Sequence, residues 1–385
     1  MTAALVIGGF SLAAWVYLLL FRGMFWLMRE RDDHDLPPDP AAWPAVVAVV
    51  PARNEADVIE RSVSGLLGQD YPGAFHLVLV DDDSDDGTGK AAAFAAAKLG
   101  AEARLQLIAG RPLAKGWTGK LWAVSQGVEA ASAAGPTYLW ITDADIAHDR
   151  QTLRRLVARA EAGRLALVSL MARLQTGTWA ERLLIPAFVF FFDMLFPFGR
   201  VNDPRSRLAA AAGGCMLVRR EALEAAGGIA AIRGEIIDDC ALGARLKAQG
   251  PIWLGLTRTS VSLRPYGSLA DIGRMVSRSA YAQLGYSPWL LAGTVAGMAL
   301  VYLAAPVLAV FGPGDARWLG LGAWGLMAAA FQPMLRYYRC SPLWGLALPA
   351  IGALYTAFTV QSAIDVWRGR GGMWKGRSQA LAASS

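Results

Sequence analysis

Cysteine and several familiar catalytic motifs are scarce or missing in this 385-residue sequence. Its three cysteines, Cys215, Cys240 and Cys340, are odd in number and too widely spaced for a disulfide framework or a zinc site. We interpret them as small buried residues in a reducing compartment. The sequence also lacks a Walker A motif and an ordered Ser-His-Asp set. It therefore gives no support to P-loop or serine-hydrolase chemistry.

Charged residues are scarce as well, at 18% against about 25% in typical soluble domains, whereas apolar residues reach 55%. The apolar excess lies in residues 3–28 and after residue 288. The net charge is +6, but the basic residues form no aromatic-interleaved stripe, so we expect no nucleic-acid partner. Many of them flank apolar segments instead, which favours contact with an anionic membrane surface. These flanking residues are Arg22, Arg29, Arg31, Arg368, Arg370, Lys375 and Arg377.

The N-terminal 28 residues are predicted to form a transmembrane anchor. Residues 3–26 are almost wholly apolar and long enough to span a bilayer. No basic region precedes them and no small-residue cleavage site follows, so an uncleaved anchor is favoured over a signal peptide. Residues 29–44, charged and rich in proline, are predicted to be a stiff linker. The basic residues after the anchor predict that the following domain is cytoplasmic, on the inner membrane.

Residues 45–270 are predicted to form an α/β domain with a mainly parallel sheet, because strand-like and helix-like patterns alternate. Strands are expected at 45–50, 75–80, 105–108 and 138–142, and helices at 55–67, 90–99 and 121–134. In such sheets, ligands bind at the carboxyl ends of the strands. We therefore expect the polar residues that follow these strands to share one edge.

Two regions leave membrane alternatives open. The phenylalanine-rich stretch 183–198 is too short for a span and is predicted to be an interfacial or lipid-facing helix, the alternative being an aromatic core helix. Residues 271–385 are predicted to hold an interfacial segment and transmembrane helices, with apolar stretches at 289–311, 317–334 and 343–364. If all three cross, the basic C-terminal tail lies outside, against the positive-inside tendency. A re-entrant or interfacial segment is the alternative.

Acidic residues gather at three places where chemistry is expected. Asp143 and Asp145 end a buried strand, and two hard oxygen ligands there suit Mg²⁺ or Mn²⁺ together with a substrate phosphate. The cluster 81–86 could accept hydrogen bonds from a nucleobase or ribose, or could form a solvated turn and helix cap. Asp238 and Asp239 precede a helical stretch. One of them could act as a general base towards an acceptor hydroxyl, or the pair could cap the helix.

Other candidates carry weaker signals. Gly213 and Gly214 precede a strand, where glycine allows close approach of a ligand or forms a tight turn. Arg53, Lys115 and Lys120 could contact phosphates, or could be solvated surface residues. His148, three residues after Asp145, is expected to be a satisfied or exposed histidine rather than a metal ligand.

In their order, these residues resemble family 2 glycosyltransferases with the GT-A fold. The resemblance covers residues 45–280 and is carried by five motifs. They are Pro51-Ala-Arg-Asn54-Glu55, the loop Val80–Thr88, Gly119-Lys120, Asp143-Ala-Asp145, and Asp238-Asp239 leading into Leu242, Arg245 and Leu246. Residues 116–122, 184–192 and 211–216 resemble more closely the hopene-associated glycosyltransferases of bacterial hopanoid gene clusters.

The resemblance implies inverting transfer from a nucleotide sugar, usually a UDP-sugar. It implies that Asp82 contacts uracil, Asp143 the nucleotide, and Asp145 a metal ion, with Asp239 as general base beside Asp238. The donor-nucleotide set it implies is Pro51, Arg53, Asn54, Glu55, Asp82, Lys120 and Asp143. Gly213, Gly214 and Arg278 are then expected near the diphosphate or the acceptor.

Two departures from the family pattern narrow the expected reaction. Asp238 stands where the family usually has Glu, and the processive Q-x-x-R-W box appears as residues 275–279 with only Arg278 kept. The loss of Gln and Trp disfavours polymer synthesis and favours single transfer to a lipid acceptor, for example a hopanoid. The alternatives are transfer to a polyprenyl phosphate and an inactive nucleotide-binding scaffold.

Overall fold

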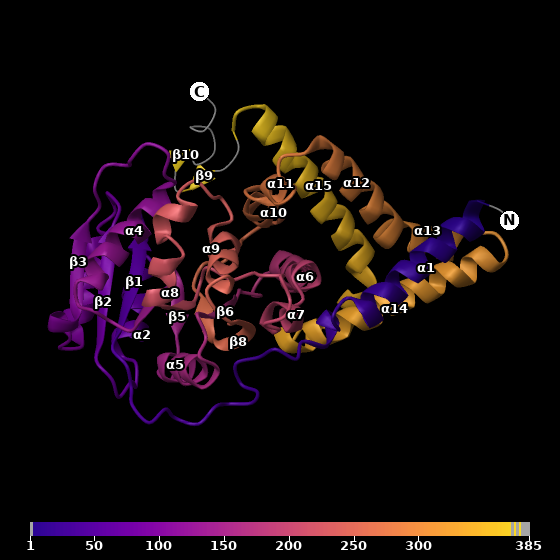
Figure 1. The fold of residues 1–385 in the computed structure, drawn as a ribbon. Coiled ribbons are helices and arrows are strands. Elements are labelled where there is room, and N and C mark those ends of the chain that lie inside the picture. The colour runs from indigo at the N-terminus through magenta and orange to yellow at the C-terminus, as the bar shows by residue number, and fades with distance from the viewer. Residues whose placement is uncertain (1–2, 371–372, 375–376, 379–385) are drawn as a thin grey trace. The chain divides into compact units, whose positions relative to one another are not determined.

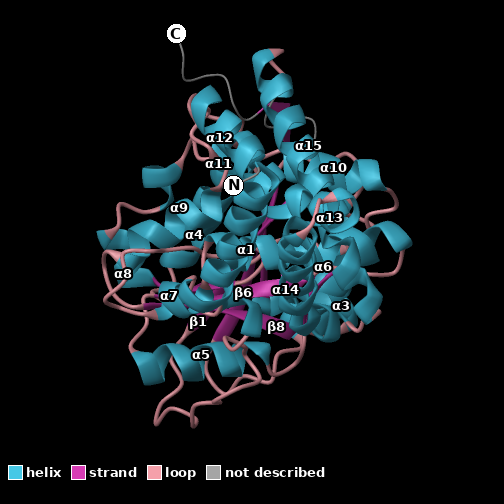
Figure 2. Ribbon diagram, turned by 90° about the vertical axis from the view of Figure 1, so that its right-hand side faces the viewer, coloured by secondary structure: helices cyan, strands magenta, loops and turns pink. Residues whose placement is uncertain are grey.

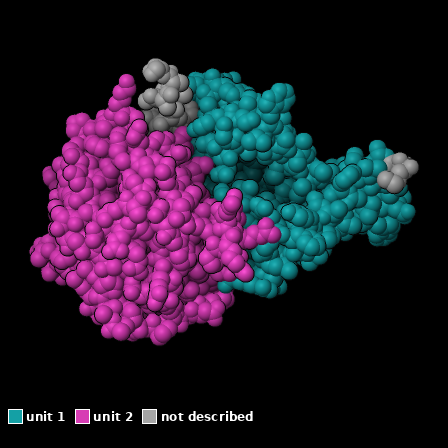
Figure 3. All heavy atoms as spheres, in the orientation of Figure 1, with its two compact units in different colours: residues 1–29, 176–199, 266–371 teal, residues 30–175, 200–265, 372–385 magenta. Residues whose placement is uncertain are grey.

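The computed structural model describes residues 3–370, 373–374 and 377–378 of the chain. Two compact units are coloured separately in Figure 3. Unit 1 contains Met1–Arg29, Thr176–Gly199 and Tyr266–Gly371, and unit 2 contains Glu30–Gln175 and Arg200–Pro265 together with Gly372–Ser385. The described residues of unit 1 form helices and loops, whereas unit 2 is built on the strands drawn in magenta in Figure 2.

Unit 2 is organised around an eight-stranded sheet with the order β3-β2-β1-β4-β7-β6-β8-β5. Its strands are β1 (Val46–Ala52), β2 (Phe75–Asp81), β3 (Leu105–Ala109), β4 (Tyr138–Ile141), β5 (Ile146–His148), β6 (Leu167–Arg173), β7 (Met216–Arg219) and β8 (Ile252–Ser262). Strands β1 to β4 are parallel, as are β6 and β8. Strand β7 runs antiparallel to β4 and β6, and β5 runs antiparallel to β8. The predicted α/β fold with a mainly parallel sheet is confirmed.

The helices of unit 2 follow the strands as the alternating pattern predicts (Figure 1). They are α2 (Ile59–Leu67), α3 (Thr88–Lys98), α4 (Gly119–Ser132), α5 (Thr152–Gly163), α8 (Arg220–Ala225) and α9 (Asp238–Lys247), with the 3₁₀ turns η2 (Glu102–Arg104) and η3 (Ile229–Ile232). Helix α7 (Phe198–Asn202) includes the point in the chain where unit 1 gives way to unit 2, and β9 (Met373–Trp374) pairs with β10 (Arg377–Ser378) near the C-terminus. Lys375 lies outside the described residues.

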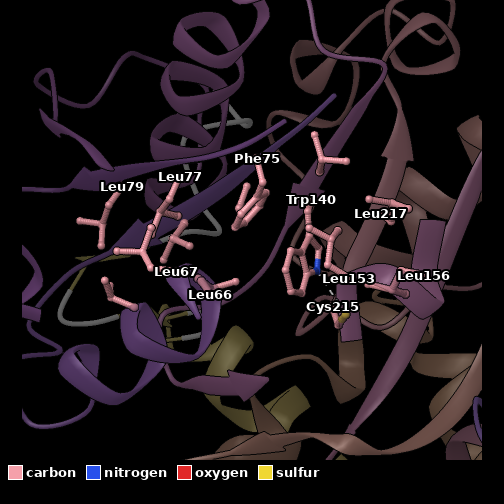
Figure 4. Packing of buried hydrophobic residues seen from close by; sticks show 14 of the residues in the cluster. Leu66, Leu67, Phe75, Leu77, Leu79, Trp140, Leu153, Leu156, Cys215 and Leu217 are labelled. Atoms are coloured by element: carbon pink, nitrogen blue, oxygen red, sulfur yellow. Dashed lines mark hydrogen bonds between the residues drawn. The ribbon is translucent and has the colours of Figure 1, made fainter. Parts of the chain in front are cut away.

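Burial explains why the central strands read as continuous apolar runs. Every residue of β1 is buried, as expected for a parallel strand covered on both faces. In the core of Figure 4, Leu66 and Leu67 of α2 pack against Leu77 of β2. The indole of Trp140 donates a hydrogen bond of 3.4 Å to the Cys215 sulfur. This core holds the ends of β1, β2 and β4 at fixed positions.

The N-terminal part of the predicted linker does not behave as a free linker. Arg31 forms a parallel bridge with Leu256 of β8, and the backbone N–H of Asp32 donates to the Leu256 carbonyl at 3.0 Å. The buried Asp32 carboxylate accepts from Thr257 and Thr259. Residues that the sequence analysis described only as charged are therefore held to β8 by backbone pairing.

Unit 1 is a helical bundle. Its helices are α1 (Ala3–Phe21), α6 (Trp179–Leu195), α10 (Leu269–Ser277), α11 (Ala280–Gln283), α12 (Pro288–Met298), α13 (Ala304–Phe311), α14 (Asp315–Tyr338) and α15 (Leu348–Trp367). Shorter turns are η1 (Phe25–Leu27), the π-helical η4 (Ala299–Leu303) and η5 (Pro342–Ala347). Among the described residues, three helical segments are long and apolar enough to span a membrane, namely Ala3–Phe21, Pro288–Phe311 and Pro342–Trp367.

The phenylalanine-rich stretch forms α6, which packs inside unit 1. Phe190 is almost fully buried, and its ring lies 5.1 Å from the rings of both Phe25 and Phe331. Thr178 and Glu181 form a capping box at the start of the helix. The preferred prediction of an interfacial or lipid-facing helix is therefore wrong, and the aromatic-core alternative holds.

Candidate functional site

The predicted site residues of unit 2 follow neighbouring strand ends. In the sheet register, Ala52 of β1 pairs with Asp81 of β2, and Val49 of β1 pairs with Ile141 of β4. The segments after these strands carry Arg53 to Glu55, Asp82 to Asp86, and Asp143 to Asp145. Parallel pairing thus brings three separated motifs to one edge of the sheet, as the sequence predicts.

Hydrogen bonds tie the first two of these segments together. The backbone N–H of Asn54 donates to the Ser84 hydroxyl at 3.0 Å, and the Asn54 amide oxygen accepts from the Asp85 N–H at 3.1 Å. Asp86 accepts from the backbone N–H groups of Ala56 and Thr88. Asp86 therefore has the structural role of the turn-and-cap alternative.

Asp82 differs from the acids around it. It is buried, whereas Asp83 is exposed. Arg53 donates to the backbone carbonyls of Asp82 and Asp83, which fixes the guanidinium beside the loop. Within the acidic run, Asp82 is thus the buried member, directly after β2.

Lys120 joins the acid of the strand end to the acids of α9. Its ammonium lies 2.9 Å from Asp143 Oδ1 and 3.2 Å from Asp238 Oδ2. Burial opposes the charge of Lys120, but the carboxylates of Asp143 and Asp238 outweigh it and raise the pKa of Lys120 well above its ordinary value. The lysine is therefore a permanent cation at the centre of the site, and the solvated-surface alternative for it is wrong.

Asp239 lies beside this ion pair in a polar backbone setting. Its Oδ2 accepts from the Gly213 N–H at 3.0 Å, and its Oδ1 accepts from the Cys240 N–H at 2.7 Å. Burial, together with repulsion from Asp238, raises the pKa of Asp239 to about 6. A carboxylate with that pKa is deprotonated at neutral pH and is a stronger base than an exposed aspartate.

Gly213 lies close to the charged groups of the site. A Cβ at this position would lie 3.3 Å from the Lys120 ammonium and 3.6 Å from Asp239 Oδ2. The Gly214 carbonyl accepts from the Thr142 hydroxyl at 2.7 Å, so the second glycine is part of the scaffold. The glycine pair thus lets the strand β7 segment approach Lys120 and Asp239 directly.

Arg264 completes the site and was not predicted from the sequence. Its Nε donates to Asp145 Oδ2 at 2.9 Å, and its Nη2 donates to Glu55 Oε2 at 2.5 Å. Glu55 is buried, and its backbone N–H donates to Thr88 Oγ1. Arg264 follows β8, so the strand-end rule could have found it had the strand at 252–262 been assigned.

The fit of a divalent cation can be judged from the donor set. Among the residues that the structure describes, no three His, Cys, Asp or Glu side chains are grouped so as to hold a metal ion. Asp143 and Asp145 nevertheless supply carboxylates one residue apart, and Mg²⁺ is commonly held by one or two carboxylates together with substrate phosphates. Lys120 and Arg264 now balance these two charges. The pair therefore fits a cation that arrives with a diphosphate, not a closed protein site.

The remaining candidates are buried or exposed residues outside the ion pairs of this cluster. His148 is buried between the Thr142 and Ser260 hydroxyls, and burial lowers its pKa to about 3. It is the satisfied histidine that the sequence analysis favours. Pro51 is buried within β1, and Arg278 is exposed after α10 in unit 1. Cys215, Cys240 and Cys340 form no disulfide.

The mixed sheet, with acidic residues at the carboxyl ends of its strands, is of the GT-A type. Residues 47–227 match the family model described as "Glycosyl transferase family 2". This match supports a glycosyltransferase family 2 domain in that part of the chain, and with it a glycosyltransferase activity.

One solved structure supports the same fold, and a second is similar at a lower level. The mannosyltransferase PcManGT from Pyrobaculum calidifontis, solved with GDP-Man and Mn²⁺, is 21% identical over 95% of this chain and 99% of its own, with a TM-score of 0.56. Glucosyl-3-phosphoglycerate synthase from Mycobacterium tuberculosis, solved with Mg²⁺ and UDP, is 19% identical over 63% of this chain and 79% of its own, with a TM-score of 0.42. The second likeness is too low to bear on function. No curated protein sequence matches this chain significantly.

Proposed function

We propose that the protein transfers one sugar, with inversion, from a nucleoside diphosphate sugar to the hydroxyl of a membrane lipid. UDP is the expected nucleotide, and a hopanoid is the acceptor class that the sequence resemblance implies. The main support is the convergence of Lys120, Asp143, Asp238 and Asp239 at one sheet edge. A cation that can meet the negative charge of the donor diphosphate therefore lies within a few ångströms of a basic carboxylate.

Each side chain has a distinct task in this proposal. Asp82 and Asp143 bind the nucleotide, and Lys120 meets the negative charge of the diphosphate. Asp239 takes the proton of the acceptor hydroxyl as its oxygen bonds to the anomeric carbon. The bond from that carbon to the diphosphate breaks, and its electron pair leaves with the nucleoside diphosphate. A divalent cation held by Asp143 and Asp145 would stabilise the charge on this leaving group.

The membrane supplies the acceptor. The three apolar helical segments support a membrane protein, and the basic residues that flank them favour placing unit 2 at the cytoplasmic face of the inner membrane. A lipid hydroxyl at that face would lie in the same compartment as nucleotide sugars. Single transfer, not polymerisation, follows from the missing Gln and Trp near Arg278.

Purified full-length protein in detergent micelles tests the reaction. It is incubated with Mg²⁺ or Mn²⁺, a panel of UDP-sugars and GDP-sugars, and membrane lipids, and products are identified by mass spectrometry. We expect one glycosylated lipid with the inverted anomeric configuration. The Asp239→Asn variant should lose transfer, whereas the control Asp203→Asn, at a partly exposed acid of unit 2, should retain it.

The outcomes separate the alternatives. Full activity of Asp239→Asn towards a polyprenyl phosphate, which is already anionic and needs no strong base, would support that acceptor instead. Nucleotide binding without transfer across the whole panel would indicate a scaffold and overturn the enzymatic proposal.

A further inference from the structure

Two criteria give different membrane-crossing segments in unit 1. One criterion is the length and composition of each helix, and the other is the packing of the helices against one another. Composition selects Ala3–Phe21, Pro288–Phe311 and Pro342–Trp367, and leaves out α14. If those three crossed a bilayer, α14 would remain on the side opposite the end of α1. The packing of α14 and α15 argues against that arrangement.

Helix α14 runs beside α1 in the same direction (Figure 1). A Cβ on Gly8 would lie 3.1 Å from the Leu319 Cβ, and a Cβ on Gly322 would lie 3.6 Å from Leu12 Cδ1. Advancing four residues along α1 therefore corresponds to advancing about as far along α14. If α1 crosses a bilayer, α14 lies at the same depth beside it.

Helix α14 also returns antiparallel to α13. A Cβ on Gly312 would lie 3.1 Å from the Arg317 N, and a Cβ on Gly320 would lie 2.6 Å from the Ala309 N. With 24 residues, α14 is about 36 Å long, more than the ~30 Å thickness of a hydrocarbon core. Its charged residues lie near its two ends, at Asp315, Arg317 and Arg336. These features fit a helix that crosses.

The segment after α14 runs back along this helix only as far as its middle. The Gln332 amide donates to the Pro342 carbonyl at 3.1 Å, and the Trp324 indole donates to the Leu346 carbonyl at 3.1 Å. Over five residues the chain thus moves from near the end of α14 to its middle. Turn η5 therefore reaches the middle of the bundle and not its far end.

Helix α15 begins at this middle level. A Cβ on Gly352 would lie 2.8 Å from the Tyr302 ring, and that ring lies 5.5 Å from the ring of Trp15, in the second half of α1. Eleven residues later, Ala363 packs with Leu291 near the start of α12. The same eleven-residue step separates Tyr302 from Leu291, so α15 runs antiparallel to η4 and α12. It ends where α12 begins.

We infer that η5 and α15 form a re-entrant segment that enters and leaves the membrane on one face, and that α1, α12–α13 and α14 are the crossing segments. The inference rests on the proposal that unit 1 lies in a bilayer. Both ends of the re-entrant segment then lie on the face where α1 ends and α14 ends. Arg22 and Arg29 are on that face together with Arg368 and Arg370, against the headgroups of one anionic leaflet. This arrangement removes the conflict with the positive-inside tendency.

Labelling of single cysteines tests the arrangement. The native Cys215, Cys240 and Cys340 are replaced by Ala, and one cysteine is then introduced into the full chain at an exposed position. The four positions, each exposed in the structure, are Ala42→Cys, Pro313→Cys, Ser341→Cys and Arg370→Cys. Sealed vesicles of one orientation are treated with a membrane-impermeant maleimide before and after detergent is added.

We expect the cysteines at positions 42, 341 and 370 to label from the same face, at least about tenfold faster than Pro313→Cys in intact vesicles. Ser341→Cys labelling together with Pro313→Cys would mean that α14 does not cross. Arg370→Cys labelling opposite to Ala42→Cys would mean that α15 crosses completely. Either result overturns the inference. Uniform labelling of all four positions without detergent would also overturn it, along with the membrane part of the proposed function.

An epitope appended after Ser385 gives a reading that does not depend on cysteine substitutions. Protease should remove it from the same face that exposes Ala42→Cys. Protection of the epitope on that face contradicts the re-entrant arrangement even if a cysteine variant fails to fold. Sugar transfer by the unsubstituted chain, measured in the same vesicles, shows whether the proposed reaction holds independently of the topology.

Discussion

At the scale of single residues, the site is an arrangement of alternating charges. Asp143 of the D-x-D motif forms an ion pair with Lys120, and Lys120 also pairs with Asp238. Arg264 links Asp145 to Glu55 in the same way. Each acid of the D-x-D motif thus has a basic partner that a bound cation and diphosphate can replace or share. These basic partners offset the repulsion between the neighbouring carboxylates.

Asp239→Asn should lower kcat by about 10²–10⁴-fold, the usual contribution of a general base, with little change in the KM of the donor. The amide keeps the size of the side chain but cannot take the acceptor proton. Steady-state kinetics with purified protein measure both constants. Asp203→Asn serves as the matched control, and an Asp239→Asn enzyme with normal kcat on a lipid alcohol would contradict the assigned role.

The pH dependence of the same enzyme follows from the raised pKa of Asp239. Burial first, and then repulsion from Asp238, bring that pKa to about 6, so the base is ionised above this pH and protonated below it. We expect kcat/KM to be level above about pH 6 and to fall about tenfold per unit below it. A pH–rate profile between pH 4.5 and 8 measures this. A profile without a break between pH 5 and 7 would argue against Asp239 as the base.

Arg264→Gln should destabilise the protein when no divalent cation is present. The buried Glu55 carboxylate then loses its partner, and because Arg264 is partly exposed we expect a loss of about 1–3 kcal/mol. Thermal unfolding in EDTA measures the change. Glu55→Gln in the same chain should restore part of it, since the two effects are coupled.

Two further measurements sharpen the Arg264 prediction. Mn²⁺ should raise the melting temperature of Arg264→Gln more than that of the unchanged protein, because the cation supplies the positive charge that Asp145 has lost. Arg205→Gln, which breaks an exposed ion pair, should change stability by less than about 0.5 kcal/mol. Equal Mn²⁺ effects in both proteins would show that Arg264 and the cation do not share Asp145.

At the scale of elements, the sequence predicts the first half of unit 2 well. Strands β1, β2 and β4 are largely buried apolar runs, and α2 has one apolar face, so the two patterns differ clearly between residues 46 and 141. The acids of the D-x-D motif and of the 81–86 loop follow directly from those strand ends. Prediction succeeds here because local pattern and parallel pairing act together.

The sequence fails to predict those features that depend on contacts between residues far apart in the chain. Helix α6 is apolar on most faces, so its sequence cannot distinguish a lipid-facing helix from one that packs against Phe25 and Phe331. Arg264 lies 119 residues from Asp145, and it was missed because the strand at 252–262 that precedes it was not assigned. The backbone pairing of Arg31 with Leu256 is equally distant in sequence. These contacts exist only once the sheet has formed.

Gly213→Ala tests the loop that leads into β7. The added methyl group would approach Lys120 Nζ to 3.3 Å and Asp239 Oδ2 to 3.6 Å, so the ion pair or the loop must shift. We expect kcat/KM to fall by about tenfold or more, since small misplacement of catalytic groups is costly. Gly250→Ala, where the new methyl meets only Ala166 at 3.5 Å, is the control. Equal activity of the two variants would show that the close approach of Gly213 is unimportant.

At the scale of the whole molecule, α1 has more than an anchoring role. Trp15 is fully buried, and its indole donates to the Val301 carbonyl at 2.8 Å. Gly8 lets α14 pack closely against the helix. The sequence predicts this segment as an uncleaved transmembrane anchor, and these contacts also make it part of the bundle that contains η4, α13 and α14.

Removal of residues 1–28 should therefore destabilise the protein and not release a stable soluble enzyme. Trp15→Ala alone should lower stability by about 2 kcal/mol, less than the 3–5 kcal/mol typical of a soluble core because lipid or detergent tails solvate the exposed surface. Melting in detergent, followed by size-exclusion chromatography, measures both changes. Phe10→Ala, at a position 62% exposed, should leave the melting temperature unchanged. A truncated chain that keeps the melting temperature and transfer rate of the full chain would mean that α1 only tethers the enzyme to the bilayer.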